Sequence, residues 1–206
     1  GLACADLGET RKAIEYHKQY LAIAREIGDR RGEGAALGNL GLAYARLGET
    51  RKAIEYYEQQ LTITRDIGDR LGEGNALGNL GSAYARLGET RKAIEYHKQY
   101  LEIAREIGDR HGEGTALGNL GIAYRHLGEM RKAVEYYEQA LEIDREIGDR
   151  RGEATDLWNM ALALDDLGRR DEAIARAEET LAIYEAIEDP YAEMVRRGLQ
   201  EWKNDE

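Results

Sequence analysis

The sequence predicts an all-α protein in which antiparallel helical hairpins stack on one another. Three observations lead to this fold class. The segment LGNLG starts at Leu37, Leu77 and Leu117, and a degenerate copy, LWNMA, starts at Leu157, so the chain repeats every 40 residues. Apolar residues within a unit are spaced by three and four, which is the period of one helix face. Proline, the strongest helix breaker, occurs once in 206 residues.

The first half of each unit predicts one helix, called helix A. In the unit 31–70 its buried stripe consists of Leu37, Leu40, Gly41, Tyr44 and Leu47. Gly48 supplies the left-handed conformation that commonly ends a helix. Glu49 or Thr50 is then placed to cap the next helix.

The second half of the unit predicts helix B. Its buried side consists of Ala53, Ile54, Tyr57, Leu61 and either Thr64 or Ile67. Gly68 is placed to end this helix, and Asp69 to cap the next helix A. Each unit is therefore a hairpin with two tight turns. Because one hairpin hides only part of its apolar surface, its neighbours must cover the rest, and an array results.

The stretch GEGAALGNLG, residues 32–41, nearly matches the spaced-glycine loops that bind nucleotide phosphates. A dinucleotide loop needs a preceding buried strand, and a P-loop also ends in Gly-Lys-Ser/Thr. Neither feature is present, so no cofactor is expected. We expect Gly41, Gly81 and Gly121, which lack a Cβ, to let helix A lie close against a neighbouring helix.

The two ends of the chain depart from the repeat. Gly1 aligns with Gly41, so we expect the chain to begin halfway through a helix A, as a fragment of a longer array would. Asp189 and Pro190 are placed as the N-cap and first residue of a last helix. Its apolar stripe comprises Tyr191, Met194, Val195, Gly198, Leu199 and Trp202. This stripe predicts a helix that caps the last hairpin; a partner-binding amphipathic segment is the alternative.

The predicted organisation is a single array over residues 1–206. It comprises a partial repeat, 1–30, the full repeats 31–70, 71–110, 111–150 and 151–189, and a capping helix, 190–206.

Composition narrows the class of function. The net charge of −11 repels a phosphate backbone, so nucleic acid is not an expected partner. No apolar run is long enough to span a membrane, and a secretory signal is absent from the first residues. The single cysteine, Cys4, has no disulfide partner, which favours a reducing cytoplasm. We expect a soluble, cytoplasmic protein.

No residue pattern indicates catalysis or a metal site. His17 and His97 stand where Tyr57 and Tyr137 stand in other units, which favours packing. No histidine pair has metal-ligand spacing with a third ligand. The many carboxylates recur with the repeat beside arginine or lysine, as in ordinary solvated helix faces. We expect no enzyme, no metal and no cofactor.

The pattern of Leu37, Leu40-Gly41, Tyr44, Ala53 and Tyr57 resembles the signature of the tetratricopeptide repeat family. The family's usual proline after helix B is missing, and the unit is longer than the usual length of about 34 residues. This longer form is similar to the repeats of the Pins/LGN adaptors, of kinesin light chains, and of sensor arrays on bacterial signalling ATPases. The resemblance implies an α-solenoid, a right-handed superhelix of hairpins, that serves as a protein-binding scaffold.

The same resemblance implies that helices A line a concave face that receives a peptide. The candidate residues in this groove are Asn39, Asn79, Asn119 and Asn159, together with Asn75, Thr115 and Ser82 at variable positions of helix A. An asparagine amide both donates to and accepts from a peptide backbone. The alternative is that these asparagines bond within the stack.

Basic residues recur near the end of helix A, namely Arg46, Arg86 and the pair Arg125-His126. If they face the groove, they favour an acidic or C-terminal carboxylate ligand; otherwise they are solvated charges. The lysine-rich carboxylate clamp of some family members is not reproduced, which favours a longer extended segment.

Three functions remain open. The leading one is a non-enzymatic scaffold that binds a peptide of a partner protein, within a larger signalling or adaptor protein. The second is self-assembly, in which the half-helix Gly1 to Leu7 stacks end to end on another copy as a homo-oligomer. The third is a regulatory array of an enzyme whose catalytic domain lies outside this chain.

Overall fold

The computed structural model describes residues 2–204, with side chains from residue 8 onward. Within that range every regular element is an α-helix, so the all-α prediction is confirmed. No helix of the described part has the length and apolar character needed to cross a bilayer. The helices are α1 (Leu2–Glu26), α2 (Arg30–Arg46), α3 (Thr50–Asp66), α4 (Arg70–Arg86), α5 (Thr90–Ile107), α6 (Arg110–His126), α7 (Met130–Ile147), α8 (Arg150–Asp166), α9 (Arg170–Ala186) and α10 (Ala192–Asn204).

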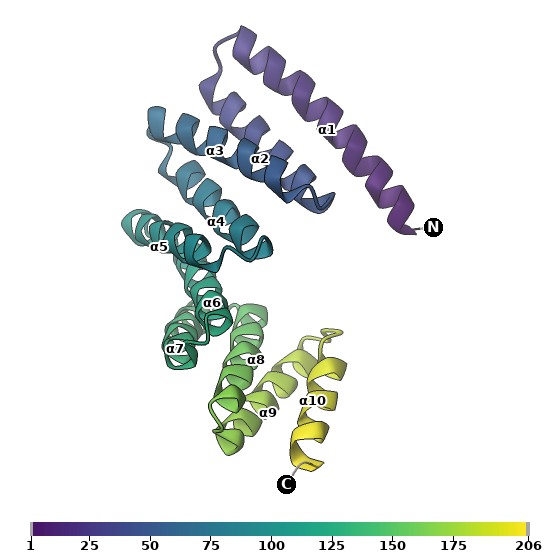
Figure 1. Cartoon of the computed structure of the whole chain (residues 1–206), viewed down its shortest axis with the longest axis vertical. Helices are drawn as coiled ribbons and strands as arrows, with labels where there is room; N and C mark the ends of the chain where they lie inside the picture. The colour runs from purple at the N-terminus through teal and green to yellow at the C-terminus, as the bar shows by residue number, and fades with distance from the viewer. Residues whose placement is uncertain (1, 205–206) are drawn as a thin grey trace. The chain divides into compact units, whose positions relative to one another are not determined.

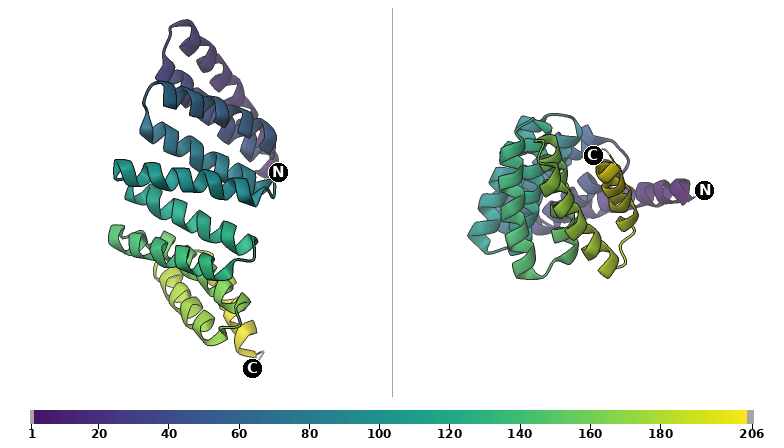
Figure 2. Two further views of the ribbon diagram at one scale, coloured as in Figure 1. Left: turned by 60° about the vertical axis from the view of Figure 1, so that its left-hand side comes forward. Right: turned by 90° about the horizontal axis from the view of Figure 1, so that it is seen from below.

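The helices, labelled in Figure 1, divide into two compact units. Unit 1 (Gly1–Ile107) contains α1 to α5, and unit 2 (Gly108–Glu206) contains α6 to α10. In unit 1, α2 pairs with α3 and α4 with α5, while α1 covers α2. In unit 2, α6 pairs with α7 and α8 with α9, while α10 covers α9 (Figure 2). The predicted A helices are α2, α4, α6 and α8, and consecutive A helices within a unit contact each other.

The turns follow the predicted local signals. Gly48 and Gly68 adopt the left-handed conformation, with φ of 76° and 68°. The Asp69 carboxylate accepts a hydrogen bond from the Gly72 backbone N–H at 3.0 Å, which caps α4. The expected side-chain cap of α3 is absent, because the Glu49 carboxylate pairs with Lys52 instead.

The glycine-rich stretch 32–41 lies inside α2 and brings two helices close together. A Cβ on Gly41 would lie 2.3 Å from the ring of Tyr57 on α3, which no real side chain permits. Gly81 and Gly121 face the rings of His97 and Tyr137 in the same way, each at 2.5 Å. The prediction of a close helix approach is confirmed, and its partner is helix B of the same hairpin.

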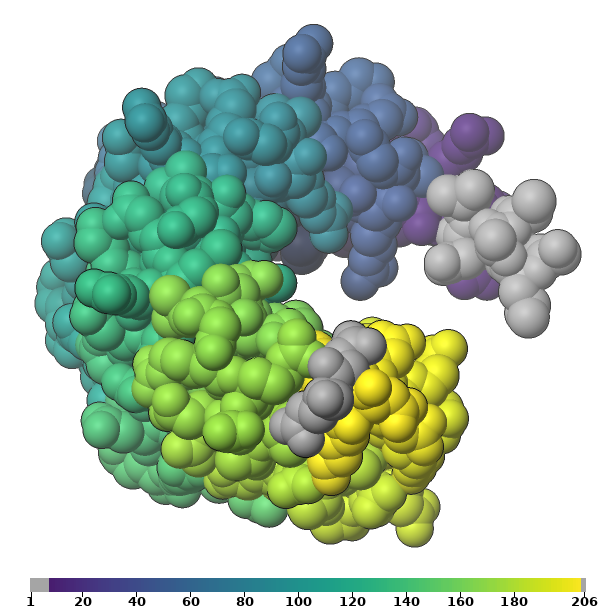
Figure 3. All heavy atoms as spheres, turned by 60° about the horizontal axis from the view of Figure 1, so that its bottom comes forward, coloured from purple at the N-terminus to yellow at the C-terminus, as the bar shows by residue number. Residues whose placement is uncertain are grey.

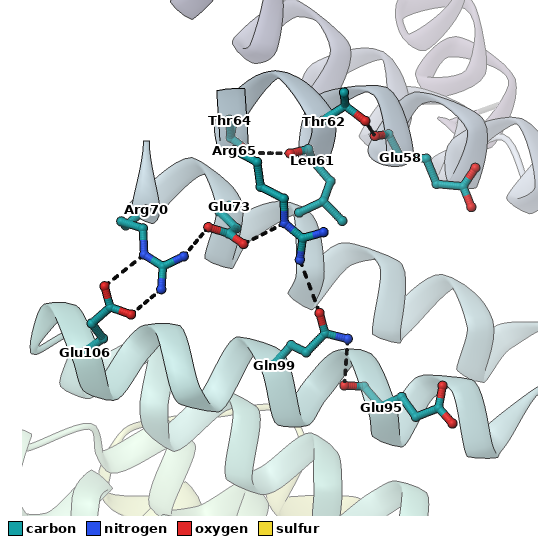
Figure 4. Close-up of polar contacts among 10 residues, drawn as sticks. All are labelled: Glu58, Leu61, Thr62, Thr64, Arg65, Arg70, Glu73, Glu95, Gln99 and Glu106. Carbon is teal, nitrogen blue, oxygen red and sulfur yellow. Dashed lines mark hydrogen bonds and ion pairs between the residues drawn. The ribbon is translucent and has the colours of Figure 1, made fainter. Parts of the chain in front are cut away.

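Buried glutamates join successive helices. Glu73 is 5% exposed at the start of α4, and it accepts a hydrogen bond from Arg65 Nε of α3 at 2.8 Å (Figure 4). Arg70 pairs with Glu73 in its own helix and with Glu106 of α5. The glutamate–arginine contacts recur at Glu33 and Glu153. The expectation that the repeated carboxylates lie on solvated faces is therefore wrong for these glutamates.

The last helix starts later than predicted. α10 begins at Ala192, because the Asp189 carboxylate accepts a hydrogen bond from the Tyr191 N–H and holds a turn over Pro190 and Tyr191. Glu188, which stands where other units have glycine, adopts a positive φ of 53°.

The capping role of α10 is confirmed by its packing (Figure 3). Val195 and Leu199 are buried, and Trp202 stacks on Trp158 of α8 with ring centroids 5.7 Å apart. Tyr191 and Met194 belonged to the predicted buried stripe but are 51% and 37% exposed; Tyr191 precedes the helix.

The first helix is also not as expected. α1 runs unbroken through Gly8, whereas Gly48 ends α2 at the corresponding position. The side chains of Cys4 and of the rest of Gly1–Leu7 lie outside the described residues.

Candidate functional site

The recurrent asparagines occupy one position on the four A helices. Asn39 is exposed, whereas Asn79, Asn119 and Asn159 are half-buried. Within the described part of the chain, none of the four side chains makes a hydrogen bond. The alternative role, bonding within the stack, is therefore not seen for them. Their amides keep donors and acceptors for a ligand.

The other candidates in unit 1 lie on the same helices. Asn75 and Ser82 are exposed on α4, and Arg46 is exposed at the end of α2. The Arg86 guanidinium donates to the Ala45 carbonyl at 3.3 Å, at the C-terminal end of α2. A cation there is favoured by the helix dipole and by carbonyls that lack helical partners.

The basic candidates of unit 2 are partly neutralised. Arg125 pairs with Asp166 of α8, with Nε and Oδ2 2.8 Å apart, and His126 is exposed. The predicted basic stretch is thus balanced by acid in unit 2. An acidic ligand stays a prediction that rests on Arg46 and Arg86 in unit 1.

A hollow of about 310 Å³ lies between the A helices of unit 2, and we call it the α6–α8 hollow. Its walls include Thr115, Asn119 and Ile122 of α6, and Thr155 and Asn159 of α8. Three residues predicted separately from the sequence, Thr115, Asn119 and Asn159, therefore share one hollow.

Two carboxylic acids form part of this hollow. Asp144 of α7 and Asp156 of α8 are only 5% and 8% exposed. Burial raises the pKa of Asp144 to about 6, and the nearby carboxylate of Asp149 adds to the shift. Burial also raises the pKa of Asp156 well above its usual value, and the neighbouring Asp144 adds to it. The pair therefore keeps a proton more readily than exposed carboxylates do.

Sequence reasoning missed this pair. The corresponding positions hold small side chains in the preceding repeats: Ala24, Thr64 and Ala104 for Asp144, and Ala36, Ala76 and Ala116 for Asp156; the last repeat has Tyr184 at the position of Asp144. The available signal was a departure from the repeat at positions that the other copies fill with small core residues.

The histidines occupy different environments. His97 is 2% exposed, and burial lowers its pKa to about 4, in agreement with the predicted packing role. His111 lies at the rim of the α6–α8 hollow, 3.7 Å from Asp149. Among the residues whose side chains are described, no three histidine, cysteine or acidic side chains are placed to hold a metal ion.

Comparison with known proteins identifies the repeat. A sequence profile of the tetratricopeptide repeat matches residues 1–66, 33–106 and 112–186. The search of curated proteins gave no significant match.

Solved structures share the fold. One is a kinesin light chain-type protein from Podospora anserina with nearly identical repeats. Its sequence is 23% identical to this chain, the TM-score is 0.74, and the match covers 91% of this chain and 93% of that chain. A signal transduction ATPase with a tetratricopeptide repeat sensor from Pyrococcus horikoshii is 25% identical, with a TM-score of 0.82, 94% of this chain and 31% of that chain covered. Aspartyl phosphate phosphatase F from Bacillus subtilis is 14% identical, with a TM-score of 0.81, 98% of this chain and 58% of that chain covered. The chain belongs to the tetratricopeptide repeat family.

Proposed function

We propose that this chain is a non-enzymatic, cytoplasmic scaffold that binds a peptide segment of a partner protein along its A helices. The observation that carries the proposal is the α6–α8 hollow, which brings together Thr115, Asn119 and Asn159. Their positions are not used by the leucine core of the hairpins, and the two asparagine amides make no hydrogen bond with any described residue. Such amides suit the backbone of an extended peptide, because they both donate and accept.

A signalling role is part of the proposal. The Pyrococcus horikoshii relative carries its tetratricopeptide repeats as a sensor within a signal transduction ATPase, and this chain covers 31% of that protein. We extend that role to this chain, with the repeat boundaries 31–70, 71–110, 111–150 and 151–189 as its units.

Selection from a random peptide library on the purified protein tests the binding face. We expect selected peptides to bind Asn119→Ala/Asn159→Ala about tenfold more weakly, because two backbone hydrogen bonds are lost. The control is Glu142→Ala, which alters an exposed residue of α7 away from the hollow. Equal affinity for the asparagine variant and the control would place the peptide elsewhere.

The predicted acidic ligand has its own test in unit 1. Arg46→Glu with Arg86→Glu is expected to weaken an acidic peptide while helicity by circular dichroism stays unchanged, because repulsion replaces charge-assisted bonds. Unchanged affinity for the acidic peptide would remove these arginines from the binding face.

A second candidate function, self-assembly, is favoured by α1. Tyr16, Ile23 and Ile27 are 70%, 54% and 69% exposed on this helix. In the next unit Ile63, which corresponds to Ile23, is 6% exposed and packs near Gly34 of its own hairpin. A second copy that covers this apolar face would form a homo-oligomer. Light scattering over a range of concentrations tests this, since only assembly predicts that the mass grows.

A further inference from the structure

The two carboxyl groups of the α6–α8 hollow have no cationic partner. Within the described part of the chain, no lysine or arginine contacts Asp144 or Asp156. Asp144 is only 5% exposed, and its Oδ2 atom has no hydrogen-bond partner among the described residues. Unpaired buried carboxyl oxygens are rare, because desolvation without a partner costs free energy. The neighbouring carboxyl groups of Asp144 and Asp156 interact with each other, and the Asp144 Oδ2 atom is left to accept a hydrogen bond from a ligand in the hollow.

The space around the pair arises from a departure in helix B. In unit 1, Gly38 and Gly78 of the A helices face the side chains of Gln60 and Tyr100. The corresponding residue of α7 is Ala140, which is too short to reach across. At Gly118 the nearest side chain is instead Asp156, whose Oδ1 lies 2.8 Å from where a Cβ would stand. In unit 2, therefore, Ala140 leaves the space that Gln60 and Tyr100 fill in unit 1, and the Asp156 carboxyl group borders it.

The charged groups around the pair are already engaged. Asp149, from the turn before α8, caps Gly152 and lies 3.7 Å from His111 of α6. Arg151 of α8 pairs with Asp189 at 3.0 Å. Glu153 of α8 pairs with Arg145 and Arg150. The acidic groups therefore outnumber the free cations around the pair, and a positive group from outside would be attracted.

We propose that the α6–α8 hollow is a specificity site for one lysine or arginine side chain of the bound peptide, held by Asp144 and Asp156. This inference rests on the proposed peptide-binding function and names the residue class that the hollow selects. Ile122 offers an apolar wall for the methylene stem, while the charged head reaches the carboxyl pair. Asn119 and Asn159 bind the peptide backbone on either side. An arginine head fits best, since its planar fork can donate to the oxygens of both carboxyl groups at once.

Binding at this site is coupled to protons. Because burial raises the pKa of Asp144 to about 6, the carboxyl group is largely ionised at pH 7 and largely protonated at pH 5. The ionised fraction at pH 5 is about one-tenth, so the cation is expected to bind about tenfold more weakly there than at pH 7. His111 and Asp149 also face the hollow, and a His111→Gln variant removes the imidazole from this pH profile.

The test uses the full chain and two small probes, acetyl-arginine-amide and its neutral counterpart acetyl-citrulline-amide. Nuclear magnetic resonance titration follows the side-chain amide signals of Asn119 and Asn159. The arginine probe is expected to shift these signals with at least about tenfold higher affinity than the citrulline probe. The isosteric variant Asp144→Asn/Asp156→Asn is expected to abolish this preference, and Glu135→Gln/Glu142→Gln, on the exposed side of α7, to keep it. Equal affinity for both probes in the unaltered chain would overturn the inference.

A second measurement separates this inference from the proposed function. Peptides selected on the unaltered chain are expected to share one arginine or lysine, and replacing it by citrulline or norleucine is expected to cost about tenfold in affinity. Peptides that need Asn119 and Asn159 but lack a basic residue would overturn the cation site and leave the scaffold proposal intact. Failure to select any peptide that depends on these asparagines would overturn both.

Discussion

Replacing both buried carboxylic acids, by Asp144→Ala with Asp156→Ala, is expected to make unit 2 more stable at pH 7. The two acids occupy positions where the start of unit 1 carries two alanines, Ala24 and Ala36. Ala24 and Ala36, at the corresponding positions of unit 1, are 1% and 0% exposed, so the repeat accommodates an alanine pair in its core. The variant removes the cost of burying two acids without a cation, which outweighs the packing contacts that their side chains make.

The size of this gain follows from the pKa of Asp144, which moves from 3.8 to about 6 in the folded protein. A raised acid pKa means that folding favours the protonated form. Well below pH 3.8 the acid is protonated in both states, so Asp144 does not lower the free energy of unfolding. The penalty grows as the pH rises from 3.8 to about 6. The shift of about two units corresponds to a cost of about 3 kcal/mol at pH 7 and of under about 1 kcal/mol at pH 4. The raised pKa of Asp156 adds in the same direction.

Trp158 and Trp202 provide the assay, because the sequence has only 2 tryptophans and both stand in unit 2. Their rings stack, so tryptophan fluorescence during guanidinium unfolding reports on unit 2 itself. A local probe matters in a repeat protein, where separate parts can unfold at different denaturant concentrations. The control Glu135→Ala/Glu142→Ala removes two negative charges from the exposed side of α7.

The double alanine variant should unfold at higher denaturant concentration than the unaltered chain, and by more at pH 7 than at pH 4. A lower midpoint at pH 7 would refute the reasoning. So would an equal gain at both pH values, because the gain would then not come from ionisation. A matching gain in the control variant would assign the effect to net charge.

Three further predictions concern the fold. Gly81→Leu should lower the melting temperature, because a Cβ there would lie 2.5 Å from the His97 ring and overpacking costs about 1 to 3 kcal/mol. An unchanged circular dichroism melt would contradict this. Glu73→Gln should destabilise unit 1 by about 1 to 3 kcal/mol in urea titration, because two arginines lose their buried carboxylate. The control Glu102→Gln, at an exposed site, should have no effect. Glu188→Gly should raise the stability of unit 2 by about 1 kcal/mol in tryptophan fluorescence, because it relieves a φ of 53°; a loss would show that the Glu188 side chain stabilises the turn.

The hairpins were predictable because their signals are local and repeated. Left-handed glycines such as Gly48, and aspartate caps such as Asp69, act within a few residues of the chain. The apolar period then assigns each helix its buried face. The errors fall at the two ends, at Gly8 and at Pro190, where a helix boundary depends on what packs against it and not on the local sequence.

The candidate site was predictable only in part. The asparagine positions followed from the family resemblance, and the structure places Asn119 and Asn159 at one hollow. The hollow itself depends on a contact between three helices, in which Ala140 fails to fill the space beside Gly118. Buried glutamates such as Glu73 were missed for the same reason, since the arginines that make their burial tolerable come from another helix.

Departures from the repeat in unit 2 fall into two physical classes. Trp158 replaces a glycine of other copies and stacks on Trp202 of α10, so this change adds packing where the array meets its cap. Asp144 and Asp156 do the opposite, because they stand where the preceding repeats have small side chains, and they raise the cost of folding near neutral pH. A local choice that opposes the fold, where a compatible residue is available, is expected mainly at functional sites. If the alanine pair stabilises unit 2 and also removes the preference for an arginine probe, the cost of this pair is explained by ligand recognition. If stability rises and the probes still bind as before, the pair has no role in binding.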